Sequence, residues 1–272
     1  FHRDHGAEVD GFAPVEMLNM SLVGPDGDID YYDGRLRVVG PDRTVVDELD
    51  CHDYLTHFSE AVEDWSYLKF PYLTALGRSA GSVRVGCLAR MNVTRTLPTP
   101  LAADAVAEFH DYTSGRANTM TLHSNWARAI EMIHAAELIR DLLVDPDLQS
   151  DSLVVTPGPE AWTGEGVGVV EAPRGTLLHH YRADRDGAVT AANLIVATTQ
   201  NNEVLNRTVR VVAEEQLDGR VDITEGMLNS VEVGIRAYDP CLSCATHALG
   251  QMPLQVTLVD SRGRVLAERV RG

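Results

Sequence analysis

The sequence predicts an α+β fold, with a helix-rich core and β-hairpin excursions. Short stretches of alternating apolar and polar residues are separated by turn-forming pairs such as Asp33-Gly34 and Pro41-Asp42, a pattern typical of β-hairpins. Between Ser124 and about Val144 the apolar residues instead recur at helical spacing. The chain has 272 residues, 44% of them hydrophobic, which is sufficient for a substantial core.

The first part of the chain predicts strands and then one helix. Residues 15–50 predict a small β-meander that includes a strand at 35–39, since turn pairs divide this region. The polar residues before it, 1–14, fit either a segment cut from a longer chain or an ordinary flexible terminus. Asp53 to Trp65 predicts a helix, because four bulky residues fall on one face: Tyr54, Phe58, Val62 and Trp65.

Helices and hairpins alternate in the remainder of the chain. Asp104–Tyr112 predicts a short helix, and Ser124 is expected to cap a longer helix with a broad apolar face, packed centrally among others. The glycines at 158–168 do not form the nucleotide-binding pattern that enters a helix, so they predict turn and strand. We further expect a hairpin at 175–198, helices at 206–215 and 225–237, and a final hairpin at 253–268.

The charge and the cysteine content limit the partners and the compartment. With 23 basic and 40 acidic residues, the formal net charge of −17 argues against binding to nucleic acid or to an anionic membrane. No apolar run approaches the ~20 residues that a membrane span requires. Four cysteines are too few for a secreted disulfide framework, so we expect a reducing compartment.

A cysteine pair near the end of the chain is the strongest chemical signal. Cys241 and Cys244 are three positions apart, and His247 follows at the same spacing. Both sulfurs can reach one metal ion from a single turn, and thiolates favour soft or borderline ions such as nickel, zinc or iron. The spacing alone also fits half of a zinc site, a redox pair, or two buried cysteines in a turn.

Four blocks of sequence give this pair a context. The segment at 237–247, Ala-Tyr-Asp-Pro-Cys-Leu-Ser-Cys-Ala-Thr-His, resembles the DPCxxCxxH signature of nickel-iron hydrogenase large subunits. The segment at 171–181, which begins Glu-Ala-Pro-Arg-Gly, resembles the EAPRG segment of that family. Residues 193–202 and 65–72 are similar to the soluble cytoplasmic branch, which includes NAD-reducing enzymes. The resemblance extends from about Glu60 to the end of the chain and keeps the family's order.

The resemblance implies a role for the whole chain. The chain would be the C-terminal part of a large subunit, with a β-rich excursion at 1–50, a core with the metal site at 51–247, and a removable extension at 248–272. The reaction would be the reversible heterolytic cleavage of H2 to protons and electrons. The electrons would pass through iron–sulfur clusters on a small subunit, then to NAD on diaphorase-type subunits.

The resemblance also implies a metal centre. In the family, two CxxC motifs hold one nickel ion through four thiolates, and the nickel is bridged to an iron that carries carbon monoxide and cyanide. Cys241 would be a terminal nickel ligand that also accepts a proton, and Cys244 a bridging ligand. Arg174 would overhang the open metal position, where Asp239 would hold its guanidinium.

Further residues match positions around that centre. Pro173 would supply shape, the Thr198 hydroxyl would bond an iron-bound cyanide, and His179 would be a second-shell histidine. His247 and the backbone carbonyl of Leu194 would hold a buried magnesium ion. In the family a maturation endopeptidase cuts after the residue equivalent to His247, so the sequence corresponds to an unprocessed precursor.

One departure from the family pattern limits what this chain can do. The N-terminal RxCGxC motif is absent, and neither Cys51 nor Cys87 belongs to a CxxC. We therefore expect a fragment that is inactive alone. Two alternatives stay open: a non-catalytic, hydrogenase-like remnant or assembly subunit, and a zinc-binding scaffold that uses Cys241, Cys244 and a histidine.

Overall fold

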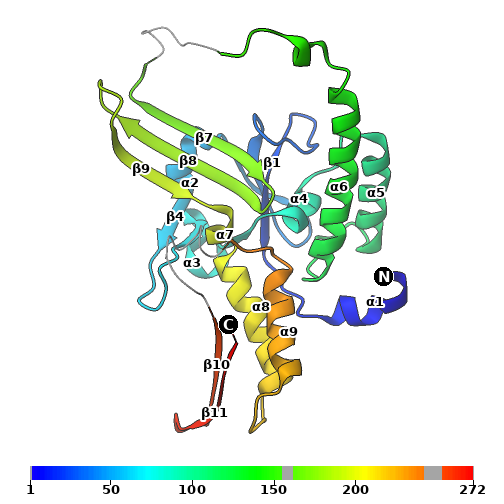
Figure 1. Cartoon of the computed structure of the whole chain (residues 1–272), viewed down its shortest axis with the longest axis vertical. Helices are drawn as coiled ribbons and strands as arrows, with labels where there is room; N and C mark the ends of the chain where they lie inside the picture. Colours follow the sequence, from blue (N-terminus) through cyan, green and yellow to red (C-terminus); the bar gives the residue numbers. More distant parts are fainter. Residues whose placement is uncertain (1, 155–161, 242–252, 272) are drawn as a thin grey trace.

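A computed structural model describes residues 2–154, 162–241 and 253–271 (Figure 1). Helices and strands alternate in the described chain, which confirms the α+β prediction. The helices are α1 (His2–Gly11), α2 (Tyr54–His57), α3 (Gly77–Ala80), α4 (Cys87–Val93), α5 (Pro100–Tyr112), α6 (His123–Leu142), α7 (Ala197–Gln200), α8 (Asn202–Leu217) and α9 (Glu225–Arg236). The strands are β1 (Leu18–Val23), β2 (Arg35–Val39), β3 (Val45–Leu49), β4 (Phe58–Ala61), β5 (Phe70–Leu73), β6 (Val83–Arg84), β7 (Glu165–Ala172), β8 (Gly175–Ala183), β9 (Val189–Ile195), β10 (Leu254–Val259) and β11 (Val265–Arg271).

The predicted β-meander is present and has one additional strand. Strands β1, β2 and β3 pair antiparallel in chain order, and β6 joins the other edge of β1 in parallel. Every residue of β1 is buried, because the strand is central in its sheet and covered on both faces. The strand β6 has only two residues, too few to produce a periodic signal in the sequence.

A second sheet and the meander share one core. Strands β7, β8 and β9 form an antiparallel sheet in chain order, as predicted for the hairpin. Leu22 and Val38 of the meander lie in the same buried cluster as Val169 of β7 and Leu178 of β8. The N-terminal strands are therefore packed directly against the sheet that carries the EAPRG segment.

Helix α4 connects this core to the helical side of the molecule. It lies between the second sheet and the α5–α6 pair (Figure 1), and all of its residues are buried. Leu88 and Met91 of α4 share a cluster with Phe109 of α5 and Ile130 of α6.

The predicted start and surroundings of α6 need correction. The helix begins at His123, so Ser124 lies within it and provides no cap. Its first half is packed against α4 and α5, and His134 is buried there. Its last turns are more open than expected from a centrally packed helix, since three apolar side chains are exposed: Ile139, Leu142 and Leu143.

The helix predicted for Asp53–Trp65 is largely wrong. Helical structure ends at His57, and Phe58–Ala61 forms β4, which pairs antiparallel with β5. Tyr54 and Phe58 are buried as the pattern indicated, but Val62 and Trp65 are exposed. The pairing with a later strand overrides a local pattern of only three turns.

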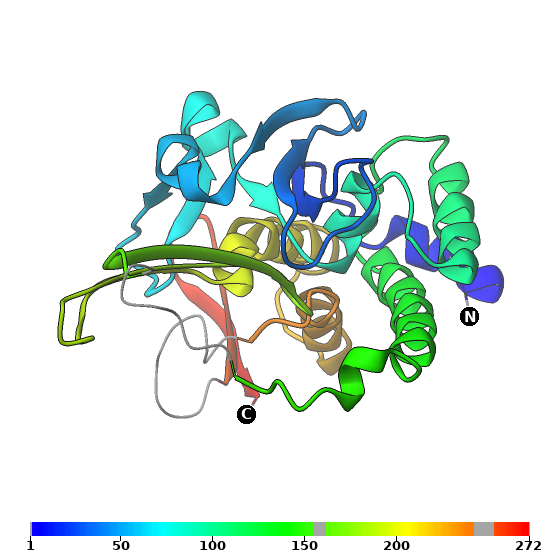
Figure 2. The same cartoon turned by 90° about the horizontal axis from the view of Figure 1, so that it is seen from above.

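The C-terminal part forms two hairpins. Helices α8 and α9 form an antiparallel pair, and β10 and β11 form a separate two-stranded sheet (Figures 1 and 2). Helix α8 extends beyond its predicted bounds, and α9 ends one residue before its predicted end. No element was predicted for α1, in which Val9 is buried. None of the helices within the described ranges combines the length and apolarity needed to cross a bilayer.

Candidate functional site

Arg174 lies in a tight turn between β7 and β8. Ala172 pairs with Gly175, so Pro173 and Arg174 are the two central residues of the turn. Gly175 has φ +131°, and a Cβ atom there would lie 2.5 Å from Val85 Cγ2 and 2.6 Å from the Gly86 nitrogen. Only glycine permits this approach, so the turn is pressed against the backbone that leads into α4.

The Arg174 side chain reaches the residue that the sequence pairs with it. Its Nε donates to the backbone oxygen of Asp239 at 2.7 Å and lies 3.3 Å from the Asp239 carboxylate. Asp239, the third residue after α9, adopts a left-handed conformation, φ +48°. Both side chains are about half exposed, so the guanidinium is anchored on one edge and accessible on the other.

Cys241 is anchored two residues later by Thr198. Its backbone N–H donates to the Thr198 hydroxyl oxygen at 3.1 Å. This bond uses an oxygen lone pair of Thr198, which leaves the hydroxyl hydrogen for a further acceptor. The predicted second strand of the hairpin ends at Ile195, three residues earlier than expected, and Thr198 is a buried residue of α7.

Two amide side chains tie α7 to the other segments of the site. Asn201 exchanges a pair of hydrogen bonds with the backbone of Val85, at 2.9 and 3.1 Å. Gln200 donates to the Thr176 carbonyl at 2.5 Å, just after the Pro173–Arg174 turn. The turn, the start of α4, α7 and the chain after α9 therefore form one hydrogen-bonded unit.

His179 and Leu194 lie farther along the sheet. They are directly paired across β8 and β9, and the His179 ring is bonded to the Tyr181 hydroxyl at 3.2 Å.

The structure thus brings together five of the predicted site residues: Pro173, Arg174, Thr198, Asp239 and Cys241. The described contacts of His179 are with other residues. Cys244 and His247 lie outside the described residues.

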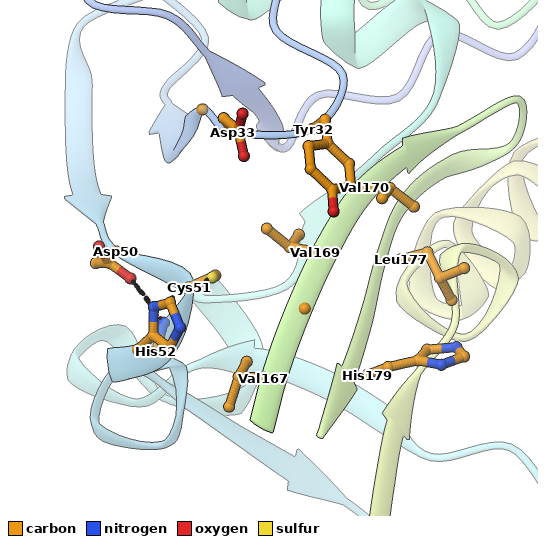
Figure 3. Close-up of a pocket in the computed structure, with 12 residues that line it drawn as sticks. Tyr32, Asp33, Asp50, Cys51, His52, Val167, Val169, Val170, Leu177 and His179 are labelled. Carbon is orange, nitrogen blue, oxygen red and sulfur yellow. Dashed lines mark hydrogen bonds and ion pairs between the residues drawn. The ribbon is translucent and has the colours of Figure 1, made fainter. Parts of the chain in front are cut away.

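His179 lines a pocket of about 400 Å³ together with Cys51 (Figure 3). Asp50, Cys51 and His52 form one wall of this pocket, and strand β7 lies opposite. Within the described ranges, Asp50, Cys51 and His52 are the one set of three or more His, Cys, Asp or Glu residues whose possible metal-ligand atoms all lie within 4.8 Å of one another. Burial and the negative charge of Asp50 raise the pKa of the Cys51 thiol, which disfavours the thiolate that a metal ion would need.

The residues around Cys241 fit one side of a nickel-iron centre. A sulfur donor suits nickel, and the anchored guanidinium and the hydroxyl beside it can bond to ligands of the metals. Cys87 contributes no comparable donor, because its thiol is bonded to the Ser124 carbonyl at 3.2 Å and burial raises its pKa. Among the described residues, Cys241 is thus the cysteine whose surroundings suit a metal ligand, and its sulfur, which is disulfide-bonded in this structure, would have to be reduced to bind one.

Sequence reasoning did not identify the groups that hold this site together. Asn201 and Gln200 lie in one of the recognised blocks, but nothing in their identity indicates that they bond to distant backbone. Arg90 is the clearest omission, since it is fully buried in an apolar helix. A charged residue in a seven-residue helix that is otherwise largely apolar was a usable signal, because buried charges are usually paired.

Comparisons of the sequence with known proteins identify a family. Residues 28–247 match the family model described as nickel-dependent hydrogenase. The chain is 68% identical over its whole length to the NAD-reducing hydrogenase HoxS subunit beta of Cupriavidus necator, of which it covers 56%. It is 38% identical to an iron-sulfur subunit of the F420-non-reducing hydrogenase of Archaeoglobus profundus, covering 93% of this chain and 53% of that protein.

A solved structure gives the same result for the fold. The crystal structure of an NAD+-reducing NiFe hydrogenase in the H2-reduced state matches with a TM-score of 0.84 and 44% identity. The match covers 90% of this chain and 54% of that one. The chain spans about half the length of the curated relatives it matches. From its sequence and its fold, the chain belongs to the nickel-dependent hydrogenase family.

Proposed function

We propose that this chain supplies the C-terminal half of the metal site in the large subunit of an NAD-reducing nickel-iron hydrogenase. The reaction is the reversible heterolytic cleavage of H2. The observation that supports it most directly is the convergence of Arg174, Asp239 and Thr198 on the segment that begins at Cys241. Three separate parts of the chain contribute to that arrangement, and the motif spacing alone would not require it.

Each residue has a chemical task in this proposal. The nickel-iron centre, when bound, supplies the electron-accepting metal pair on which H2 is polarised. Cys241 would hold nickel through its thiolate and accept a proton there, and Cys244 would be a ligand to both metals. Arg174 presents a fixed, permanently charged guanidinium at the open side of Cys241, and Asp239 fixes its orientation.

The remaining predicted residues support that centre. Thr198, which accepts from the Cys241 amide, would donate its hydroxyl hydrogen to a cyanide ligand of the iron, which would also carry carbon monoxide. Pro173 shapes the turn next to Arg174, and His179 acts at longer range through the sheet. His247 and the Leu194 carbonyl would hold a magnesium ion, and a maturation endopeptidase would cut after His247.

A complete centre needs partners for this chain. One CxxC supplies two of four thiolates, so we propose that the other two belong to the same subunit, outside the 272 residues. The matched relative, whose length is covered to 56%, leaves room for such a segment. Electrons leave through iron–sulfur clusters of a small subunit to NAD on diaphorase-type subunits, in the cytoplasm.

The test uses the complete native subunit, expressed with its partner subunits and maturation proteins. We expect H2-dependent NAD reduction, one nickel ion per large subunit, and iron in excess of nickel because the small subunit carries iron–sulfur clusters. Cys241→Ser should abolish both activity and nickel retention, because oxygen is a harder and less acidic ligand than sulfur. Cys51→Ser is the matched control, because the Cys51 thiol lies in the pocket of about 400 Å³ described above. This substitution should leave the nickel content and the activity unchanged.

Two outcomes would replace the proposal. A complete complex without nickel or H2 oxidation would indicate a non-catalytic, hydrogenase-like remnant or assembly subunit. Zinc alone, lost in Cys241→Ser, would indicate a zinc-binding scaffold.

A further inference from the structure

Arg90 is a buried cation whose side chain is directed at the turn that carries Arg174. The residue belongs to α4, and its side chain is only 2% exposed. Its Nη1 donates to the Ala172 carbonyl at 2.9 Å, and its Nη2 donates to the Pro173 carbonyl at 3.1 Å. These are the two carbonyls immediately before Arg174, so the guanidinium fork grips the turn through its backbone.

The rest of the guanidinium is occupied by two carboxylates. Nη1 also bonds to Glu171 at 2.9 Å, and Nη2 bonds to Glu131 at 2.8 Å. Nε completes a bidentate pair with Glu131. Burial alone would lower the pKa of Arg90, but the charges of Glu131 and Glu171 reverse this effect and raise it. All three nitrogens are used, so the orientation of the fork is fixed.

Glu171 fixes the opposite side of the same turn. Its side chain is fully buried; one carboxylate oxygen accepts from the Leu22 amide at 3.0 Å and from the Thr176 hydroxyl at 2.6 Å. The other oxygen accepts from Arg90. The residues on both sides of Pro173–Arg174 are therefore bound to groups in α4, in β1 and at the start of β8.

The position of Arg174 follows from this arrangement. Arg174 is half exposed, and its described anchor is the contact of its Nε with Asp239. A long, flexible side chain with one anchor holds its tip in place only if its backbone is also fixed. We propose that Arg90 is a positioning residue for Arg174: the buried Arg90–Glu131–Glu171 cluster fixes the turn so that the Arg174 guanidinium stays aligned beside Cys241.

This inference rests on the proposed hydrogenase function, and its test separates the two. In the complete enzyme, Arg90→Lys keeps the charge but loses the fork that spans two carbonyls. We expect nickel and iron to be retained, the KM for H2 to be unchanged, and kcat to fall by about 10- to 100-fold, the size of effect typical of a misplaced group. Arg43→Lys is the matched control, since Arg43 likewise donates to two backbone carbonyls, those of Asn92 and Thr94.

A double-variant cycle distinguishes positioning from general stabilisation. If Arg90 acts through Arg174, adding Arg90→Lys to Arg174→Lys should lower kcat by no more than about 3-fold, because coupled groups are not additive. Multiplication of the two single losses would overturn the proposal, and so would a normal kcat in Arg90→Lys. An enzyme that oxidises no H2 in any form would instead overturn the proposed function.

A second variant keeps the test valid if Arg90→Lys does not fold. Glu131→Gln loosens Arg90 from the side away from the turn and leaves every contact of the turn itself in place. We expect a smaller loss of kcat, also non-additive with Arg174→Lys, at unchanged metal content. An unchanged kcat, or a loss that multiplies with that of Arg174→Lys, would remove the positioning role.

Discussion

Arg174 is held beside the cysteine segment in two ways that differ in chemistry. The shorter contact, 2.7 Å, is with the backbone oxygen of Asp239, whereas the carboxylate is 3.3 Å away. A substitution of the Asp239 side chain therefore removes the weaker of the two contacts. The backbone contact survives as long as the chain keeps its left-handed conformation at Asp239, φ +48°.

This difference predicts the relative effects of two substitutions in the complete enzyme. Arg174→Lys should reduce the rate of H2 oxidation by ~10²-fold, about 3 kcal/mol of barrier, because lysine lacks the rigid fork. Asp239→Asn should have a smaller effect in the same direction, and the double variant should be little slower than Arg174→Lys. Steady-state rates with metal analysis of each sample measure this. Near-normal rates in Arg174→Lys would leave Arg174 with a packing role only.

The candidate site could be predicted from the sequence only where a motif carried the information. Arg174, Asp239, Thr198 and Cys241 were all named from recognised blocks, and the structure brings them together. Arg90 and Asn201 were not named, because their importance comes from bonds to backbone atoms more than 80 residues away. Every residue has a backbone carbonyl, so the type of the accepting residue does not reveal such a hydrogen bond.

At the scale of elements, the glycine at the base of the β7–β8 turn sets the distance between the turn and α4. Gly175→Ala should lower the free energy of unfolding by about 1–3 kcal/mol more than the cost of placing alanine at a positive φ, since the alanine Cβ would overlap Val85 and Gly86. Gly187→Ala is the control, because Gly187 also has a positive φ, +82°, but open space around it. Denaturant unfolding of the complete subunit compares the two, and equal losses would mean that the close approach is not required.

Helix α5 is capped by a side chain from α6. Thr99 provides no side-chain cap for α5, and the Glu137 carboxylate instead accepts from the amides of Leu101 and Ala102, at 3.2 and 3.1 Å. Burial opposes ionisation of Glu137, but hydrogen bonds from Thr99 and from these amides outweigh it and lower its pKa. The negative charge also lies at the positive end of the α5 dipole.

The lowered pKa of Glu137 predicts a pH dependence of stability. A carboxyl group whose pKa is lower in the folded state stabilises that state above its ordinary pKa, and the contribution is lost as the pH falls through the folded value. Glu137→Gln should therefore lower the unfolding midpoint at neutral pH. Below about pH 4 the unfolding midpoints of the variant and the wild type should approach each other. Glu108→Gln, at an exposed position of α5, is the control. A constant difference at all pH values would contradict the prediction.

Helices and strands were predictable where the sequence pattern was long and no pairing with another segment overrode it. Strands β7 to β9 and helices α5, α8 and α9 follow their patterns, with shifts at the ends. The stretch Asp53–Trp65 failed because its middle is paired with Phe70–Leu73, an interaction absent from the window itself. The four-residue helix α7 and the two-residue strand β6 are shorter than any pattern that periodicity can detect.

At the scale of the whole molecule, the last hairpin is attached weakly. Within the described residues, strands β10 and β11 pair only with each other, and Arg271 links them to α9 through Asn229 at 2.5 Å and Glu232 at 3.3 Å. Leu254 adds a partly buried apolar contact with the α8–α9 pair. Surface ion pairs of this kind contribute about 0–1 kcal/mol each.

Removal of the extension at 248–272 should therefore change the stability of the subunit little. We expect the processed and unprocessed forms of the complete subunit to differ in Tm by only a few degrees, the shift produced by about 1 kcal/mol. Calorimetry of the two forms, prepared with and without the proposed maturation endopeptidase, measures this. A drop of more than about 10 °C on processing would indicate that the hairpin is part of the core.

The hydrogen bonds that assemble the turn around Arg174 also determine the order in which the chain can fold. They join residues 149 positions apart, Leu22 to Glu171, and 116 positions apart, Val85 to Asn201. Contacts of such high sequence separation form late, because the entropy of closing long loops must be overcome before they become favourable. During synthesis the β-meander therefore emerges well before the carboxylate that completes it, and the cysteine segment after α9 emerges later still. The nascent chain thus passes through a stage in which the strands of the meander are exposed before the cysteine segment has been synthesised, and exposed, unpaired strands make such a stage prone to aggregation.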